Sequence, residues 1–332
     1  MPDGDNGLVC AYALDGEGGG RPLDWPEVEA WAAAPEGGDG TAGLQWVHLS
    51  RRAEGAKRWL AEKSGLDPVV QEALLAEETR PHCDLIGEGV LLILRGVNTN
   101  PGADPSDMVS IRLWIEEQRV VSSRNRKLIA IQSLEDAIAA GRGPGSASDL
   151  ICDLAKALVE RMDPLLDDLD REIDALEVVG LRAAGSDHRA KLQKIRRRLI
   201  SLKRYIAPQR MALTKLIDLR LPWFEAHGLI RLRELGERVI RYVEDLEALR
   251  ERAQVMQDEL TNRLSEQMNR NMYLLTIVAS IFLPLGFITG LLGVNVGGIP
   301  GTEEPLGFLM LCGLLLFVGL LEYWIFKRLK WI

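Results

Sequence analysis

Side chains that bind metal ions strongly are scarce in this sequence. The 332 residues include four cysteines and four histidines, and no two cysteines form a C-x-x-C pair. The sequence therefore predicts neither a structural zinc site nor a disulfide framework. His82 and Cys83 are adjacent, but such a pair is more often structural than zinc-binding, so a structural role is favoured. We expect no bound cofactor.

An excess of basic residues is also absent. The formal net charge is -8 at pH 7 and no basic patch dominates, which argues against nucleic acid as a partner. Residues 1–7 are acidic and glycine-rich without an apolar core, so we expect no secretory signal there. No phosphate-binding loop and no nucleophile–His–acid set can be placed, so we do not expect an enzyme.

The most informative absence is that of charge between residues 272 and 296. About 20 apolar residues are enough to cross a bilayer as a helix. Glycines and Pro300 end this run, and a second apolar run covers 306–326. The sequence therefore predicts a hairpin of two transmembrane helices, 272–294 and 306–326, joined by the loop 295–305.

The first 148 residues carry short apolar runs that alternate with segments of helical spacing. Proline stands near the start of two of these helical segments, where it is tolerated. The expected strands are 8–15, 46–50, 90–97 and 108–124, and the expected helices are 24–34, 53–64, 68–78 and 127–140. We predict an α/β domain with a mixed sheet over 1–148, with a linker at 141–148.

Every pattern after residue 148 is helical. The segment 149–228 reads as two antiparallel helices, an acidic one from 149 to about 184 and a basic one from 187 to about 218. Opposite charges predict a salt-bridged hairpin, with a specific ion-handling role as the alternative. From 229 the helical pattern continues to the membrane, so 229–271 is expected to be a stalk.

Small and polar residues recur on this long helix at seven-residue spacing. One row is Asp258, Ser265, Met272, Ala279, Gly286 and Gly293, and a second is Asn262, Asn269, Thr276 and Leu283, with Gly290 beside it. Such rows lie on the stripe of a helix that packs against copies of itself, and small residues permit close approach in lipid. Since two spans cannot enclose a polar path alone, we predict a pore built from several copies. Helix packing without a pore is the alternative.

The distribution of charge predicts the orientation in the membrane. The loop 295–305 contains Glu303 and Glu304 and no basic residue, whereas the tail 327–332 is basic. The positive-inside rule then places both termini in the cytoplasm. We expect a multi-pass protein of the inner (plasma) membrane.

Glu322 lies inside the second predicted span. A carboxylate at membrane depth is a functional candidate by default. Its closeness to Lys327 favours an interfacial position beside that lysine instead.

The first span resembles the first membrane helix of the CorA-type divalent-metal transporters. The run SIFLPLGFITG at 280–290 and the motif Gly293-Val294-Asn295 carry this resemblance. The family's mark is Gly-Met-Asn, so Val294 stands where methionine is usual. Gly-Gly-Ile-Pro at 297–300 resembles the zinc-transporting ZntB branch. Further stretches similar to that branch are Arg80-Pro81, residues 94–98 and Lys330-Trp331.

The resemblance covers nearly the whole chain and implies an α+β membrane protein. Its copies would form a homopentamer with a cytoplasmic funnel and a pore lined by the first span. Asn295 would stand in a ring at the outer mouth and hold a hydrated cation through its side-chain oxygen, and Gly293 would let the backbone turn. Glu303 and Glu304 would concentrate divalent cations there.

The same resemblance implies roles deeper in the pore. Met272 and Leu283 would form hydrophobic constrictions, with polar or open steps between them at Asn269, Thr276 and Gly286. Asp258 is a candidate for metal or proton sensing, although a merely solvated carboxylate is an equal alternative.

The resemblance implies proton-coupled uptake of zinc. Zinc efflux and a magnesium or cobalt channel remain alternatives, because the pore stripe contains neither histidine nor cysteine, the ligands that zinc prefers. A membrane-anchored oligomer that transports nothing is an alternative of a different class. The expected partners are copies of the chain, divalent cations and lipid.

Overall fold

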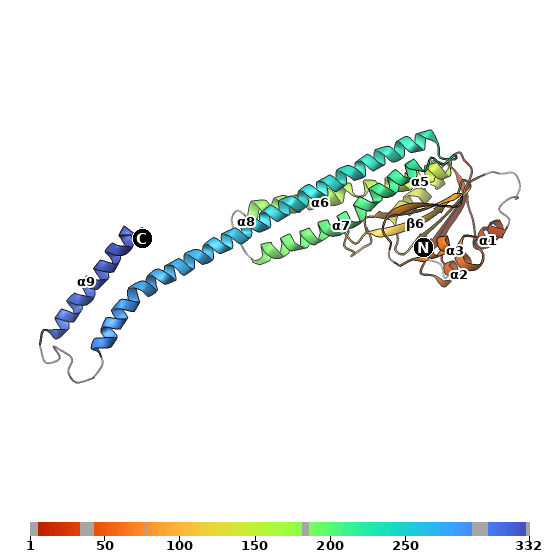
Figure 1. Ribbon diagram of the computed structural model, residues 1–332. Helices are drawn as coiled ribbons and strands as arrows, with labels where there is room; N and C mark the ends of the chain where they lie inside the picture. Colours follow the sequence, from red (N-terminus) through yellow and green to blue (C-terminus); the bar gives the residue numbers. More distant parts are fainter. Residues whose placement is uncertain (1–5, 34–42, 78, 181–185, 294–304, 330–332) are drawn as a thin grey trace. The chain divides into compact units, whose positions relative to one another are not determined.

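The computed structural model describes residues 6–33, 43–77, 79–180, 186–293 and 305–329. The chain divides into two compact units, residues 1–257 and 258–332. Figure 1 shows the chain and labels most of its helices. Each unit is described by itself below.

A seven-stranded sheet forms the centre of the first unit. Its strands are β1 (Leu8–Leu14), β2 (Gly20–Pro22), β3 (Gln45–Ser50), β4 (His82–Ile86), β5 (Gly89–Gly96), β6 (Val109–Ile115) and β7 (Arg119–Arg124). Their order in the sheet is β2-β1-β3-β7-β6-β5-β4. β3 pairs with β7 in parallel, and the other neighbours are antiparallel. The predicted mixed sheet is confirmed.

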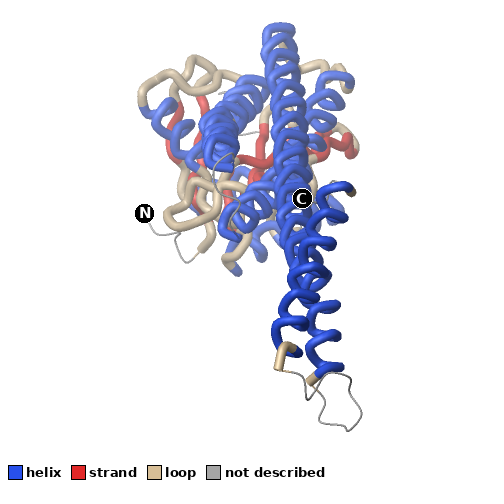
Figure 2. The backbone as a smooth tube through the Cα atoms, turned by 90° about the vertical axis from the view of Figure 1, so that its left-hand side faces the viewer, coloured by secondary structure: helices blue, strands red, loops and turns tan. Residues whose placement is uncertain are grey.

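Helices cover both faces of this sheet (Figures 1 and 2). On one face α1 (Trp25–Ala33), α2 (Glu54–Glu62) and α3 (Pro68–Leu75) build an apolar core with the strands. The other face carries α4 (Ile129–Ala139), α5 (Ala147–Glu160) and α7 (Ser186–Asp218). Because both faces are covered, β6 is buried at every residue, the polar Ser110 and Arg112 included.

The structure corrects the predicted strands in two respects. The run 108–124 is two strands, β6 and β7, joined by a turn at 116–118. Residues 116–118, Glu-Glu-Gln, contain neither glycine nor proline, so no common turn residue marks this break in the sequence. β2 and β4 were not predicted, since β2 has only three residues and β4 (HCDLI) mixes polar and apolar side chains.

The helix expected from 149 to about 184 is also interrupted. Arg161 and Met162 form a turn, and α6 (Asp163–Gly180) follows it. Pro164 explains the break, because proline has no N–H to donate and disfavours helical geometry in the residue before it.

The segment 141–148 is tied into the first unit. Gly143 N donates to Gly18 O at 2.6 Å, and Ser146 Oγ accepts from Asp149 N at the start of α5. The boundary expected at residue 148 therefore lies inside this compact unit.

The acidic face of α6 is paired mainly with α8 (Ala226–Leu292). Arg252 of α8 donates to three carboxylates of α6, those of Asp170, Asp174 and Glu177. Arg198 of α7 binds Glu172 at 2.9 Å. The predicted salt-bridged hairpin of α6 and α7 is thus a three-helix arrangement, and among the described residues α8 supplies most of the partners of α6.

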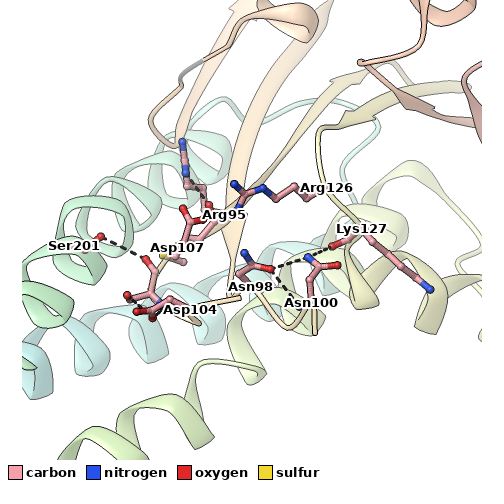
Figure 3. A network of polar contacts seen from close by, with 10 residues as sticks. Arg95, Asn98, Asn100, Asp104, Asp107, Arg126, Lys127 and Ser201 are labelled. Atoms are coloured by element: carbon pink, nitrogen blue, oxygen red, sulfur yellow. Dashed lines mark hydrogen bonds and ion pairs between the residues drawn. The ribbon is translucent and has the colours of Figure 1, made fainter. Parts of the chain in front are cut away.

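Side-chain hydrogen bonds hold the loop between β5 and β6 (Figure 3). Asn98 Oδ1 accepts from Asn100 Nδ2 at 2.7 Å, and that same nitrogen donates to Lys127 O at 3.1 Å. Arg95 donates to Thr79 O and Met108 O. The stretch 94–98, one of those carrying the family resemblance, therefore has a structural role here.

His48 is fully buried in β3 and neutral. Ser122 Oγ donates to Val47 O (3.2 Å), so its lone pairs accept from Trp46 Nε1 (2.9 Å) and His48 Nδ1 (2.8 Å). The other ring nitrogen, Nε2, is buried without a partner in the described part of the chain. Burial, together with the charge of Arg124, lowers the pKa of His48 well below its usual value.

We predict that His48 makes the first unit sensitive to acid. The unfolded chain binds a proton at His48 as pH falls through about 6.5, whereas the folded chain does not, so stability present above that pH is lost below it. Between pH 7.5 and 5.5 the native chain should lose about 1.4 kcal/mol more than His48→Asn, which keeps a donor near the Nδ1 position. Chemical unfolding of the full-length protein in detergent, followed by tryptophan fluorescence, measures this difference. Equal pH dependence in both proteins would contradict it.

Candidate ion pathway

The long helix α8 changes its surroundings along its length. Its buried residues follow each other at spacings of three and four: Gly228, Leu232, Leu235, Val239, Tyr242, Leu246, Leu249 and Ala253. Such spacing is that of a helix packed along one side. From residue 254 to 293 no side chain of α8 is buried. From residue 272 on this exposed surface is apolar, and the described chain leaves it largely uncovered.

In the second unit, α8 and α9 (Gly307–Arg328) form an antiparallel hairpin (Figure 2). Both are long and apolar enough to cross a membrane. On α8 the partly covered residues are Ile277, Ser280, Ile281, Pro284, Leu285 and Ile288. On α9 they are Gly307, Leu311, Leu315, Val318, Gly319 and Glu322, with Phe326 buried. Each set occupies one side of its helix, so the two helices cover one face of each other.

The predicted pore residues lie away from this covered face. At about 100° per residue, Met272, Leu283 and Gly286 lie roughly 130–170° around α8 from the covered stripe. Thr276 and Asn269 lie on the flank, roughly 90–110° from it. All five are exposed. A methyl group at Gly286 would meet no atom within 4 Å. The face available to other copies is the one that carries these residues.

Toward groups outside its own helix, the hydroxyl oxygen of Thr276 can act only as an acceptor. Its Oγ1 donates to Met272 O at 2.8 Å. With its only hydrogen used inside the helix, the oxygen has its lone pairs left for water or a cation. Thr289, which was not among the predicted pore residues, makes the same kind of bond to Leu285 O at 3.0 Å, but it lies on the opposite flank of the stripe.

The predicted outer mouth lies mainly outside the described residues, namely at Val294, Asn295, Glu303 and Glu304. Gly293 is described: its N–H donates to Thr289 O at 2.9 Å and closes the last turn of α8. The roles expected at this end of the hairpin stay predictions. Asp258, the first residue of the second unit, is exposed.

His82 and Cys83 do not form a metal site. Successive residues of a strand point to opposite faces, so their side chains leave β4 in opposite directions. His82 Nδ1 donates to Arg80 O at 2.8 Å, and burial raises the pKa of the Cys83 thiol to about 12. No group of three or more His, Cys, Asp or Glu side chains suited to a metal ion occurs among the described residues.

Glu322 does not lie beside Lys327 as its sequence position suggests. It belongs to the stripe of α9 that faces α8, and its Oε2 is enclosed without a hydrogen-bond partner in the described chain. Spacing along the sequence could not reveal this, because the same residue can reach either the helix end or the neighbouring helix.

Comparisons with known proteins agree along almost the full length. A family model described as CorA-like Mg2+ transporter protein matches residues 41–328. The divalent cation transporter CmaX of Pseudomonas aeruginosa is 40% identical over 330 residues, 99% of this chain and 98% of that protein. The zinc transport protein ZntB of Pectobacterium atrosepticum is 35% identical over 328 residues, 98% and 97% of the two chains.

Solved structures give the same picture of the fold. The structure of full-length CmaX is similar with a TM-score of 0.82, and all of both chains is covered. The CorA magnesium transporter of Methanocaldococcus jannaschii has a TM-score of 0.78 at 20% identity and covers 98% of this chain and 99% of that one. At that identity the second likeness concerns the fold alone.

We predict that the uncovered face of α8 meets other copies of the chain. In a Cys312→Ser background, Leu283→Cys should be joined between copies by a short bifunctional thiol reagent in membranes. Ile281→Cys, two residues away but on the side that faces α9, should remain largely unjoined. Denaturing gel electrophoresis gives the fraction of joined chains. More joining at residue 281 than at 283 would contradict the assignment of the two faces.

Proposed function

The chain belongs to the family of CorA-like Mg2+ transporter proteins, and we propose that it takes up zinc ions together with protons through a homopentameric pore in the inner membrane. It is a membrane transporter of divalent cations of the CorA and ZntB type, not an enzyme. The choice of ion, its direction, the number of copies and the placement of both termini in the cytoplasm belong to the proposal.

The observation that carries the pore is the exposed stripe of α8 opposite α9. Residues Met272 to Gly286 on this stripe are exposed in the described chain, although both helices are apolar enough for a membrane. Packing several copies around this stripe covers it and encloses a path that a single hairpin cannot form. Small and polar side chains on this stripe would leave wide positions along the path, and its larger apolar side chains would form narrow ones.

Hydration of the ion fits the residues along this path. The described part of the chain has no cluster of metal ligands, and the stripe offers amide, hydroxyl and thioether groups. Neutral oxygens bind the water shell of a cation weakly, which permits fast release. Thr276 provides such an oxygen with its lone pairs unused. Rings of Met272 and Leu283 would act as constrictions that exclude water when closed.

At the outer end, the proposal assigns attraction of cations to Glu303 and Glu304 and their first binding to a ring of Asn295. These residues lie outside the described ranges. At the cytoplasmic end, Asn269 forms the exit and Asp258 senses metal or protons. Both are exposed on α8.

Zinc is supported by the 35% identity to ZntB over nearly the whole chain and by the Gly-Val-Asn and Gly-Gly-Ile-Pro motifs. A magnesium or cobalt channel is the main alternative, because CmaX is named only as a transporter of divalent cations. Zinc efflux is the alternative in direction, and a membrane-anchored oligomer without transport is the alternative of a different class.

We predict zinc uptake by proteoliposomes that contain the purified protein. Uptake should exceed that of magnesium and should fall when an ionophore dissipates the pH gradient. Asn295→Ala should lower zinc uptake by about tenfold or more, because a whole ring of side-chain oxygens is lost at once. The matched control is Leu309→Ala, on the exposed surface of α9, which should leave uptake unchanged.

Each component of this proposal has its own contradictory outcome. Uptake that ignores the pH gradient removes the coupling to protons, and full uptake by Asn295→Ala removes the ring. Absence of flux for both ions from a folded protein would favour the anchored oligomer.

We also predict that the hydroxyl oxygen of Thr276 is needed for transport. Thr276→Val keeps the branched shape and removes the oxygen, and should lower zinc uptake about three- to tenfold. Thr276→Ser keeps the oxygen and should restore most of the uptake. Initial rates in proteoliposomes test this pair, and equal rates for the valine and serine variants would rule out a role for the oxygen.

A further inference from the structure

Glu322 is the one carboxyl side chain in the described parts of the two spans, 272–292 and 307–326. An ionised carboxylate at membrane depth costs several kcal/mol unless it is paired or reaches water. Such a residue requires an explanation, and the transport path along the other face of α8 does not use it.

The position of Glu322 is on the contact between the two helices. It follows Leu315 and Gly319 on the stripe of α9 that faces α8, one turn before the buried Phe326. Counting about 1.5 Å per residue from the adjoining ends of α8 and α9 places it near the level of Ile277. Around Ile277 the half-covered side chains of α8 include no charged group. The carboxyl oxygen Oε2 is enclosed there without a donor in the described chain.

The charged and titratable groups around this site lie toward the end of the hairpin. On α8 they are Tyr273 and Arg270, both about one to two turns from the level of Ile277. On α9 they are Tyr323, next to Glu322, and Lys327 and Arg328, beyond Phe326. The Oε2 atom of Glu322 has no hydrogen-bond partner in the described chain. The guanidinium group of Arg328 lies instead over the Trp324 ring, 5.2 Å from its centre.

Two positions of this side chain therefore favour two protonation states. Packed against α8, a neutral acid leaves only a hydrogen bond unmade, whereas a carboxylate would be an unpaired charge in an enclosed place. Turned toward Lys327 and Arg328 at the membrane surface, a carboxylate gains cations and water. The two positions differ by one bound proton, so acid favours the packed position and alkali the other.

We propose that Glu322 is a proton-binding site in the membrane hairpin, and that its proton controls how α9 packs on α8 and thereby ion passage along the opposite face of α8. The proposal rests on the proposed transport function. The proton comes from the side of the membrane on which the basic end of α9 lies.

The test measures zinc flux in proteoliposomes over a series of pH values with the native chain, Glu322→Gln and Glu322→Asp. Glutamine imitates the protonated acid, so its flux should persist and lose the dependence on pH that the native chain shows, which is at most about tenfold per pH unit for one proton. Aspartate keeps a titratable group and should keep a dependence. An unchanged pH profile in Glu322→Gln overturns the proposal.

Infrared spectroscopy gives a second result that does not depend on transport. In lipid, lowering the pH should make the native protein show the carbonyl stretch of a protonated carboxyl group that is missing from Glu322→Gln and, should that variant fail to fold, from Glu322→Leu. Absence of this band from the native protein overturns the proposal. A native chain that shows the band but moves neither zinc nor magnesium contradicts the proposed function and leaves the proton site intact.

Discussion

The structure depends on one constraint: residues 272–292 of α8 and the helix α9 are apolar on most sides, and each covers only one face of the other. The remaining apolar surface cannot stay in water, because its exposure would cost about 25 cal/mol for each Å². Lipid can cover most of it. The small and polar members of the stripe with Met272, Leu283 and Gly286 are poor partners for lipid and good ones for a second helix. Because this stripe faces away from α9, it is available to line a path between copies of the chain.

The first unit packs against the part of α8 that belongs to it, which ends at residue 257. Eight buried residues hold α8 between Gly228 and Ala253, and Arg252 joins its end to three carboxylates of α6. Exposed pairs of this kind contribute little one by one, yet a cluster around a single arginine orients the helix. The sheet below them contains neutral His48 and deeply buried strands, so this unit resembles a rigid support rather than a metal-binding domain in its described part.

Much of this organisation could be predicted from the residues, and the exceptions have physical reasons. Charge-free runs are a strong pattern. The predicted end of the first span, residue 294, lies two residues beyond the end of α8 at Leu292, and the predicted second span, 306–326, lies within two residues of the bounds of α9. The turn at 116–118 was missed because its residues, Glu-Glu-Gln, include neither glycine nor proline. The position of Glu322 depends on a tertiary contact that spacing does not encode. For the candidate path, the heptad rows predicted which residues share a face of α8, but not which face α9 covers.

The central claim is that copies of the chain surround a path lined by the stripe from Asn269 to Gly286. Electron cryo-microscopy of the protein in lipid nanodiscs tests it most directly. The account predicts a symmetric ring, proposed to contain five copies, with Met272, Thr276 and Leu283 facing the axis and α9 on the outside against lipid. A ring in which this stripe faces lipid, or a single hairpin with no partner copies, would contradict it.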